Sequence, residues 1–190
     1  MNHKVIAKTY GVPINYHRSP DKYFNWDGKQ ANVKGLPEHD ILHEISHYIM
    51  SPKKYRKHVN FYLGRGPDED YTMYTNTISK ANPTKPVERK GAQQEEELTC
   101  VLEFIFAALY QDIETIQLTM QNRQYMYKSS TGLKWEIGSD EFLKIIKKLQ
   151  VKKLIDKNWV PVALKKNKVI NSSHLSNLSN FREEVMKSIC

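Results

Sequence analysis

This sequence is poor in cysteine and has no long apolar run, and each shortage excludes a class of protein. Its 190 residues include only Cys100 and Cys190, which cannot build the disulfide framework of a small secreted domain. No stretch approaches the ~18 consecutive apolar residues of a membrane helix, and the N-terminus lacks the apolar core of a signal peptide. We therefore expect a cytoplasmic protein with no membrane association.

Aromatic residues, in contrast, are plentiful. They make up 11% of the chain, and this content argues against a disordered chain, which lacks the aromatics needed to close a core. The length suits one domain, or a domain with an appended subdomain. We expect a metal-binding catalytic domain over residues 1–138 and a basic helical extension over 139–190, packed on the same domain.

The net charge of +8 is distributed unevenly. Residues 36–104 carry nine basic and eleven acidic groups, a net charge of −2, whereas residues 139–168 carry nine lysines against three acids, a net charge of +6. A basic segment suits an acidic protein or a nucleic acid, and composition does not choose between them. The charge is therefore a property of one segment, separate in sequence from the acidic middle of the chain.

Periodicity and turn residues predict an α+β fold, and the motif His43-Glu44-x-x-His47 makes the expected fold zincin-like. A small N-terminal β-sheet would pack on a central helix, with additional helices toward the C-terminus. Strands are expected over the first 35 residues, with Asp27-Gly28 as a two-residue hairpin turn. The expected helices run from Pro37 to Ser51, from about Gln93 to Asp112 and from Ser139, and a loosely ordered tail from Asn171 precedes a short last helix.

The most informative motif is His43-Glu44-x-x-His47. A chain of this composition would contain roughly 0.02 such patterns by chance. Imidazoles four residues apart on one helical face can hold a metal ion, and the glutamate between them can act on water. The apolar stripe of the same helix lies nearly opposite the two histidines. Asp40, one turn earlier, would orient a histidine or act only on the helix dipole.

A third ligand must come from elsewhere in the chain. The two acidic clusters available are Asp68-Glu69-Asp70 and Glu95-Glu96-Glu97. The second cluster opens an amphipathic helix, and Glu96 lies with Cys100 and Glu103 on the face opposite its apolar stripe. Two such helices facing each other would complete a site of two histidines and one carboxylate, with Glu96, Glu97 or Asp68 as the third ligand.

These motifs resemble the elongation factor P hydroxylase family. The stretch LHEISH is followed by the triplet Val59-Asn60-Phe61, by Gly66-Pro67-Asp68, and then by Glu96 with the run Leu102-Glu103-Phe104. The resemblance covers about residues 36–110. It implies that His43, His47 and Glu96 hold a non-haem iron ion, Fe(II), and that the reaction hydroxylates a modified lysine of a protein substrate. Glu44 would then handle protons near the metal.

Three functions compete at this stage. The first is the iron-dependent hydroxylase, acting on an acidic protein such as a translation elongation factor, with Lys148 and Lys152 in the docking surface. The second is a gluzincin-like zinc metallopeptidase with Glu44 as the general base. The third, a basic binding module with a structural metal, is disfavoured because structural zinc has four closed protein ligands. A nucleic acid is a less favoured partner for the same lysine-rich segment.

Overall fold

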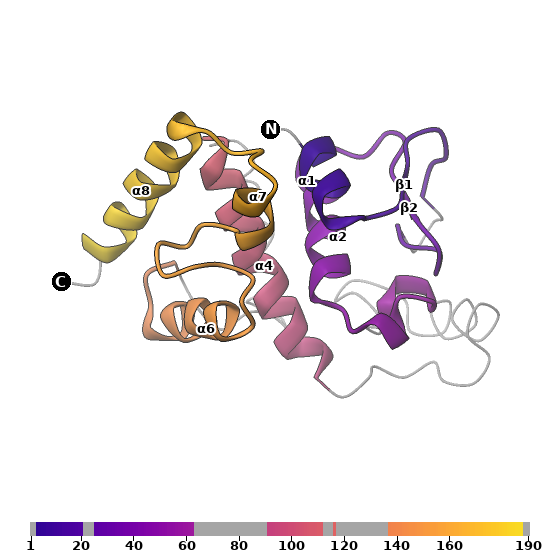
Figure 1. Ribbon diagram of the computed structural model, residues 1–190. Coiled ribbons are helices and arrows are strands. Elements are labelled where there is room, and N and C mark those ends of the chain that lie inside the picture. Colours follow the sequence, from indigo (N-terminus) through magenta and orange to yellow (C-terminus); the bar gives the residue numbers. More distant parts are fainter. Residues whose placement is uncertain (1–2, 21–24, 63–90, 112–115, 117–136, 188–190) are drawn as a thin grey trace.

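The computed structural model describes residues 3–20, 25–62, 91–111, 116 and 137–187, and these are mostly helical with one small sheet, as an α+β fold requires (Figure 1). No helix within these ranges is long and apolar enough to span a membrane. The elements in chain order are α1 (His3–Tyr10), β1 (Ile14–Asn15), β2 (Ala31–Asn32), α2 (Glu38–Met50), the 3-10 helices η1 (Lys53–Tyr55) and η2 (Val59–Tyr62), α4 (Ala92–Leu109), α6 (Asp140–Val151), α7 (Val162–Lys166) and α8 (Ser172–Lys187).

The N-terminal segment corrects the expectation of strands over the first 35 residues. Residues 3–10 form α1, because Ile6 and Tyr10 are four residues apart and lie on one helical face toward the core. The Tyr10 ring meets Phe106 of α4 edge to face, with 5.8 Å between ring centroids. The sheet consists of two short strands, β1 and β2, which pair in parallel with Ile14 opposite Ala31.

The expected two-residue hairpin at Asp27-Gly28 is also wrong in its length. Trp26 and Ala31 form a single antiparallel bridge, so the turn between them runs over residues 27–30. Gly28 nevertheless has a requirement that only glycine meets, since its φ is +91° and a Cβ would approach the Lys57 carbonyl oxygen to 2.8 Å. The segment KYFNW that was expected to pair here lies partly outside the described residues.

Helices α2 and α4 form the centre of the molecule and match the sequence expectations. Pro37 precedes the first turn of α2, Glu38 and Asp40 occupy that turn, and Ser51 caps its end before Pro52. Figure 1 shows α4 running between α1 and α2 on one side and α6 and α8 on the other, and α4 contacts α2, α6 and α8. Because α4 has neighbours on several sides, it is apolar nearly all round its C-terminal half.

The helix α6 begins where the sequence predicts. The Ser139 hydroxyl accepts a hydrogen bond from the Phe142 backbone N–H at 3.2 Å, which is an N-cap. Phe142, Ile145, Ile146 and Leu149 are buried, whereas Leu154 lies beyond the end of the helix. Buried apolar side chains from residues 3–20, 25–62, 91–111 and 137–187 belong to one continuous core, so the segment after residue 138 packs on the segments before it.

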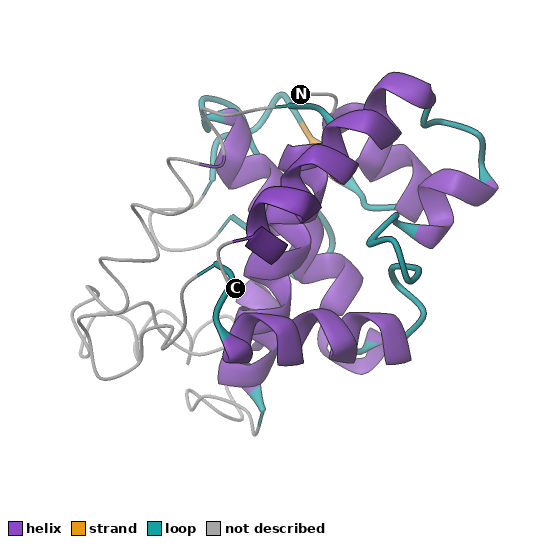
Figure 2. Ribbon diagram, turned by 90° about the vertical axis from the view of Figure 1, so that its left-hand side faces the viewer, coloured by secondary structure: helices purple, strands orange, loops and turns teal. Residues whose placement is uncertain are grey.

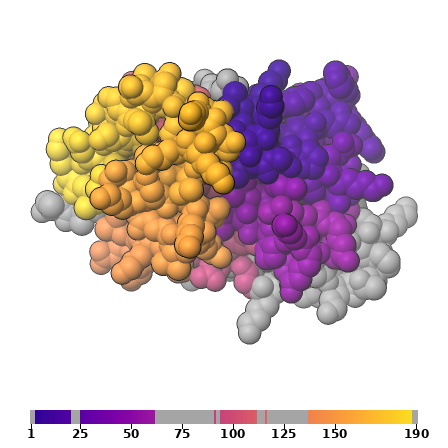
Figure 3. Space-filling view, in the orientation of Figure 1, coloured from indigo at the N-terminus to yellow at the C-terminus, as the bar shows by residue number. Residues whose placement is uncertain are grey.

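The C-terminal segment corrects the expectation of a loosely ordered tail. Residues 172–187 form α8, in which Leu178 and Val185 are buried, and α8 packs on α4 (Figure 2). The Asn171 side-chain oxygen accepts a hydrogen bond from the His174 backbone N–H at 3.0 Å. Asn177 donates to the Leu109 carbonyl oxygen at 3.3 Å. The asparagines that suggested disorder therefore cap this helix and attach it to α4. In the space-filling view the N-terminal and C-terminal halves adjoin along a long seam (Figure 3).

Candidate metal centre

Three predicted ligands meet between α2 and α4. The ligand atoms of His43, His47 and Glu96 all lie within 4.8 Å of one another. The Glu96 carboxylate lies between the two rings, with Oε2 3.0 Å from His47 Nε2 and Oε1 3.6 Å from His43 Nε2. The i,i+4 spacing on α2 places both histidines toward α4, and Glu96 is in the first turns of α4. The donor set of two imidazoles and one carboxylate fits zinc or Fe(II).

The other ring nitrogen of each histidine is held by a further residue of α4. His43 Nδ1 lies 2.9 Å from Glu103 Oε2, and His47 Nδ1 lies 3.3 Å from Thr99 Oγ1. These contacts turn both Nε2 atoms toward Glu96, which is the orientation that a shared ion requires. Of the two roles expected for Asp40, orienting a histidine is performed by Glu103. Asp40 lies in the first turn of α2, where its charge favours the helix dipole, and is 3.3 Å from His39 Nε2.

Two stacked aromatic rings, those of Phe61 and Trp26, cover one side of His47, and we call this pair the Phe61–Trp26 wall. The Phe61 ring stacks on His47 with centroids 5.7 Å apart, and Trp26 stacks on Phe61 at 4.7 Å. Asn60 and Phe61 both have positive φ, a conformation that costs energy in residues with side chains. The Asn60 N–H donates to the Trp26 carbonyl oxygen at 3.0 Å and holds this bend in place. The side chains of His43 and Glu96 remain 17% and 16% exposed, so the cluster is accessible from solvent.

Glu44 is buried beside the cluster and is only partly hydrogen-bonded. Its Oε1 accepts a hydrogen bond from the Asn25 side-chain amide at 3.0 Å. Its Oε2 is buried and has no hydrogen-bond partner within the part of the chain that the structure describes. A buried carboxylate oxygen without a partner is costly, and such atoms mark places where a proton, water or ion is handled.

The electrostatics of the cluster favour a cation. Burial by itself lowers the pKa of His47, but the nearby carboxylates of Glu96, Glu44 and Glu95 outweigh burial and raise that pKa above its ordinary value. Glu95 is itself buried and accepts a short hydrogen bond from the Ser51 hydroxyl. An excess of carboxylates around two imidazoles is an environment that a divalent ion would neutralise.

The remaining predicted site residues lie elsewhere. Burial raises the pKa of Glu97, and the opposing charge that lowers it comes from Lys148 of α6, so Glu97 faces α6 and not the cluster. Lys148 and Lys152 are exposed, and Lys152 follows the last turn of α6. Asp68 lies outside the described residues. Among the described acidic residues, Glu96 therefore completes the group with His43 and His47.

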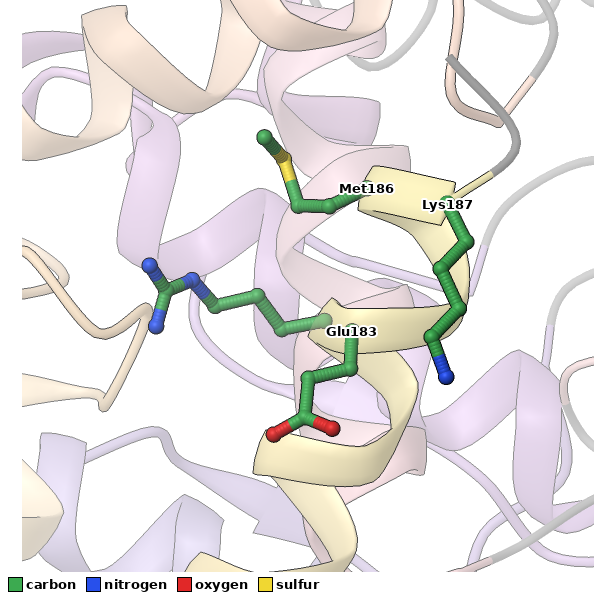
Figure 4. A pocket seen from close by; sticks show the side chains of 4 residues that line it. Glu183, Met186 and Lys187 are labelled. Carbon is green, nitrogen blue, oxygen red and sulfur yellow. The ribbon is translucent and has the colours of Figure 1, made fainter. Parts of the chain in front are cut away.

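Sequence reasoning assigned no role to Thr99, Asn25 or Phe61 as partners of the cluster. Thr99 and Glu103 follow Glu96 by three and seven residues, so they share one face of α4, and this spacing could have identified them. No local signal marks Asn25 as a partner of Glu44, because the contact joins a loop to a helix 19 residues away. A further hollow, lined by Arg182, Glu183, Met186 and Lys187 of α8, shares no residue with the cluster (Figure 4).

Comparisons of this chain with protein-family models, with curated proteins and with solved structures found no match.

Proposed function

We propose that this protein is a metal-dependent hydrolase of the zincin-like kind, a peptidase in which His43, His47 and Glu96 hold zinc. The observation that carries this proposal is the buried Oε2 of Glu44, which has no hydrogen-bond partner among the described residues. A general base needs an oxygen available to accept a proton, and Asn25 fixes the other oxygen of the same carboxylate. Glu44 occupies the position between two ligand histidines that the HExxH pattern reserves for this base.

The chemistry divides between the ion and the protein. A zinc ion at this centre would supply Lewis acidity, whereas an iron ion would add redox chemistry toward dioxygen. Glu44 would take a proton from the attacking water at Oε2 and return it to the leaving amine nitrogen. The Phe61–Trp26 wall excludes water from one side of His47. Glu103 and Thr99 hold the histidine rings so that their Nε2 atoms stay available.

A second candidate function is the iron-dependent protein hydroxylase that the sequence resembles. Residues that carry the resemblance gather at the cluster although they are far apart in the chain. Phe61 of the Val59-Asn60-Phe61 triplet stacks on His47, and Glu103 of the Leu102-Glu103-Phe104 run contacts His43. The set of two histidines and one carboxylate is the facial arrangement of non-haem iron oxygenases. On this proposal the substrate is a modified lysine of an acidic translation elongation factor.

One experiment separates the two functions. The protein is freed of metal with a chelator and reloaded with Zn²⁺, or with Fe²⁺ in the presence of dioxygen and a chemical reductant, and is incubated with a complex peptide mixture and with elongation factor P. The reductant supplies the electrons that convert the second oxygen atom of dioxygen to water. Mass spectrometry then distinguishes a broken peptide bond with one water added from an intact chain with one oxygen atom added. The hydrolase predicts the first product with zinc, and the hydroxylase predicts the second with iron.

The Glu44→Gln variant tests the role of the base directly. Glutamine keeps the size and the hydrogen bond from Asn25 but accepts no proton at neutral pH. We expect metal binding to persist and cleavage to fall by about 100-fold or more. Glu141→Gln on α6, an exposed glutamate, is the matched control and should leave both unchanged. Cleavage retained in Glu44→Gln with zinc bound would exclude the hydrolase.

The partner proposed for either activity is an acidic protein that meets the lysine segment, residues 144–168. All nine lysines of this segment are exposed, and Val151 among them is 75% exposed. Its aromatic residue Trp159 is buried, so the segment offers no exposed ring on which a nucleic-acid base would stack. Lysines around an exposed valine suit an acidic polypeptide with apolar side chains. We also propose a reducing cytoplasm as the compartment of this protein, because a chain with only Cys100 and Cys190 has no disulfide framework to maintain.

A further inference from the structure

We propose that Glu103 is a positioning residue that sets the metal affinity of the centre through His43, and that the two histidines are therefore unequal ligands. This inference rests on the proposed metal site. The Glu103 side chain is 2% exposed and reaches His43 from the opposite helix, with 2.9 Å between Oε2 and Nδ1. The contact joins a carboxylate of one helix to a histidine of another, between two residues that are 60 positions apart in sequence.

The chemistry of a carboxylate fixes the state of His43. An ionised carboxylate has only acceptor atoms, so the proton of a neutral His43 must reside on Nδ1. The lone pair is then on Nε2, the ring nitrogen that faces Glu96 and would bind the proposed metal ion. The negative charge behind the ring also increases the electron density that Nε2 donates to a metal.

His47 is held in a different way. Its Nδ1 lies 3.3 Å from the Thr99 hydroxyl, a longer contact with an uncharged group. A hydroxyl both donates and accepts, so Thr99 orients the ring without fixing the position of the proton. It also adds no charge behind the ring. The centre thus contains one imidazole supported by a buried anion and one supported by a neutral group, although both belong to the same motif on α2.

The inference predicts how metal affinity and folding stability separate. If Glu103 serves the metal, Glu103→Gln weakens binding without destabilising the metal-free protein, because glutamine fills the same space and no longer buries a charge. If Glu103 serves only the packing of α2 on α4, the same change lowers the melting temperature of the metal-free protein and leaves the affinity unchanged. Metal affinity falls and the melting temperature does not fall in the first case, whereas the melting temperature falls and the affinity stays unchanged in the second.

The test measures Zn²⁺ affinity by competition with a chromophoric chelator, on the full chain and its variants. We expect Glu103→Gln to weaken binding by about 10- to 100-fold. Thr99→Val should weaken it less, and the exposed control Glu141→Gln should leave it unchanged. Differential scanning calorimetry of the metal-free proteins supplies the second readout, in which Glu103→Gln should melt no lower than the wild type.

Each remaining outcome has a defined meaning. Wild-type protein that binds no Zn²⁺ or Fe²⁺ would remove the metal centre and the proposed function with it. A wild type that binds metal while Glu103→Gln binds equally well would overturn this inference alone. Should Glu103→Gln not fold, Glu103→Asp repeats the test, since it keeps the charge and draws the oxygen back by one methylene. It should then bind Zn²⁺ several-fold more weakly, and an unchanged affinity would also overturn the inference.

Discussion

The interface between α2 and α4 and the lysine segment use charge in opposite ways. Between the helices, the side chains of Glu44, Glu95 and Glu103 are buried around two histidines and each has a specific hydrogen-bonding partner. In the lysine segment, all nine cations are exposed, and Lys165 is paired with Asp156 at the surface. Buried charges interact strongly because water does not screen them, and exposed charges interact weakly. On the proposals above, charge at the interface would govern stability and metal binding, whereas charge in the lysine segment would govern encounters with an acidic protein.

The largest expected effect follows from filling the interface with a cation. At free Zn²⁺ about 1,000 times the Kd, the wild-type protein should gain about 4 kcal/mol in its free energy of unfolding. His47→Ala removes a ligand and should abolish this gain. Urea unfolding with and without Zn²⁺ measures both. An equal gain in His47→Ala would show that zinc binds elsewhere in the chain.

A smaller effect should separate buried from partly exposed hydrogen bonds of the same residue type. Ser51 is buried and donates to the Glu95 carboxylate, so Ser51→Ala leaves a buried charge without this donor and should cost about 1–3 kcal/mol. Ser139 caps α6, and Ser139→Ala should cost about 1 kcal/mol. Chemical denaturation of both variants compares them. A greater loss in Ser139→Ala would contradict the contrast between buried and partly exposed polar groups.

The lysine segment contains one acidic residue, Asp156, whose pKa should make the stability of the protein depend on pH. Burial alone would raise the pKa of Asp156, but hydrogen bonds from Lys165 and from the backbone N–H groups of Asn158 and Val160 lower it below its ordinary value of 3.8. A carboxyl whose pKa is lower in the folded state stabilises the fold above its unfolded value, and this contribution is lost as pH falls through the folded value.

Stability should therefore decline below about pH 4 in part through Asp156, and Asp156→Asn should remove that part of the decline. Urea unfolding between about pH 2.5 and about pH 6, a range that extends to both sides of pH 4, measures how steeply the free energy of unfolding depends on pH. The effect is modest because the Asp156 side chain remains 24% exposed to water, which weakens its ion pair with Lys165. Identical slopes in the two proteins below pH 4 would contradict the assigned role of Asp156.

The smallest effect on folding is expected from the lysines. Reversing Lys148 and Lys152 to glutamate should change the free energy of unfolding by no more than about 0.5 kcal/mol, because exposed substitutions are nearly neutral. The same double reversal should weaken binding to an acidic protein, more strongly at low salt. Lys29 and Lys34, which are exposed in the N-terminal part, give a control with an equal charge change. Equal weakening by both pairs would remove the docking role of the lysine segment.

The sequence predicted the helices whose signals are local. The periodicity of α4, the N-terminal proline of α2 and the Ser139 cap of α6 act within a few residues, and all three helices form where they were expected. Two of the wrong expectations fall on segments with weak local signals. Residues 3–10 became a helix through contacts with the core, and residues 172–187 became one because α4 offers an apolar surface to Leu178.

The candidate site divides in the same way. Helical spacing alone groups His43, Glu44 and His47 on one helix. The same spacing places Glu96, Thr99 and Glu103 on one face of another helix, so both groups can be identified from the sequence. The contact between the two groups cannot be predicted in this way, because no local sequence signal relates α2 to α4. The assignments of Glu103 to His43, of Asn25 to Glu44 and of Glu97 to α6 depend on how whole elements pack against one another. Local periodicity thus defines which residues share a face, whereas packing defines which faces meet, because packing energy arises between elements far apart in the chain.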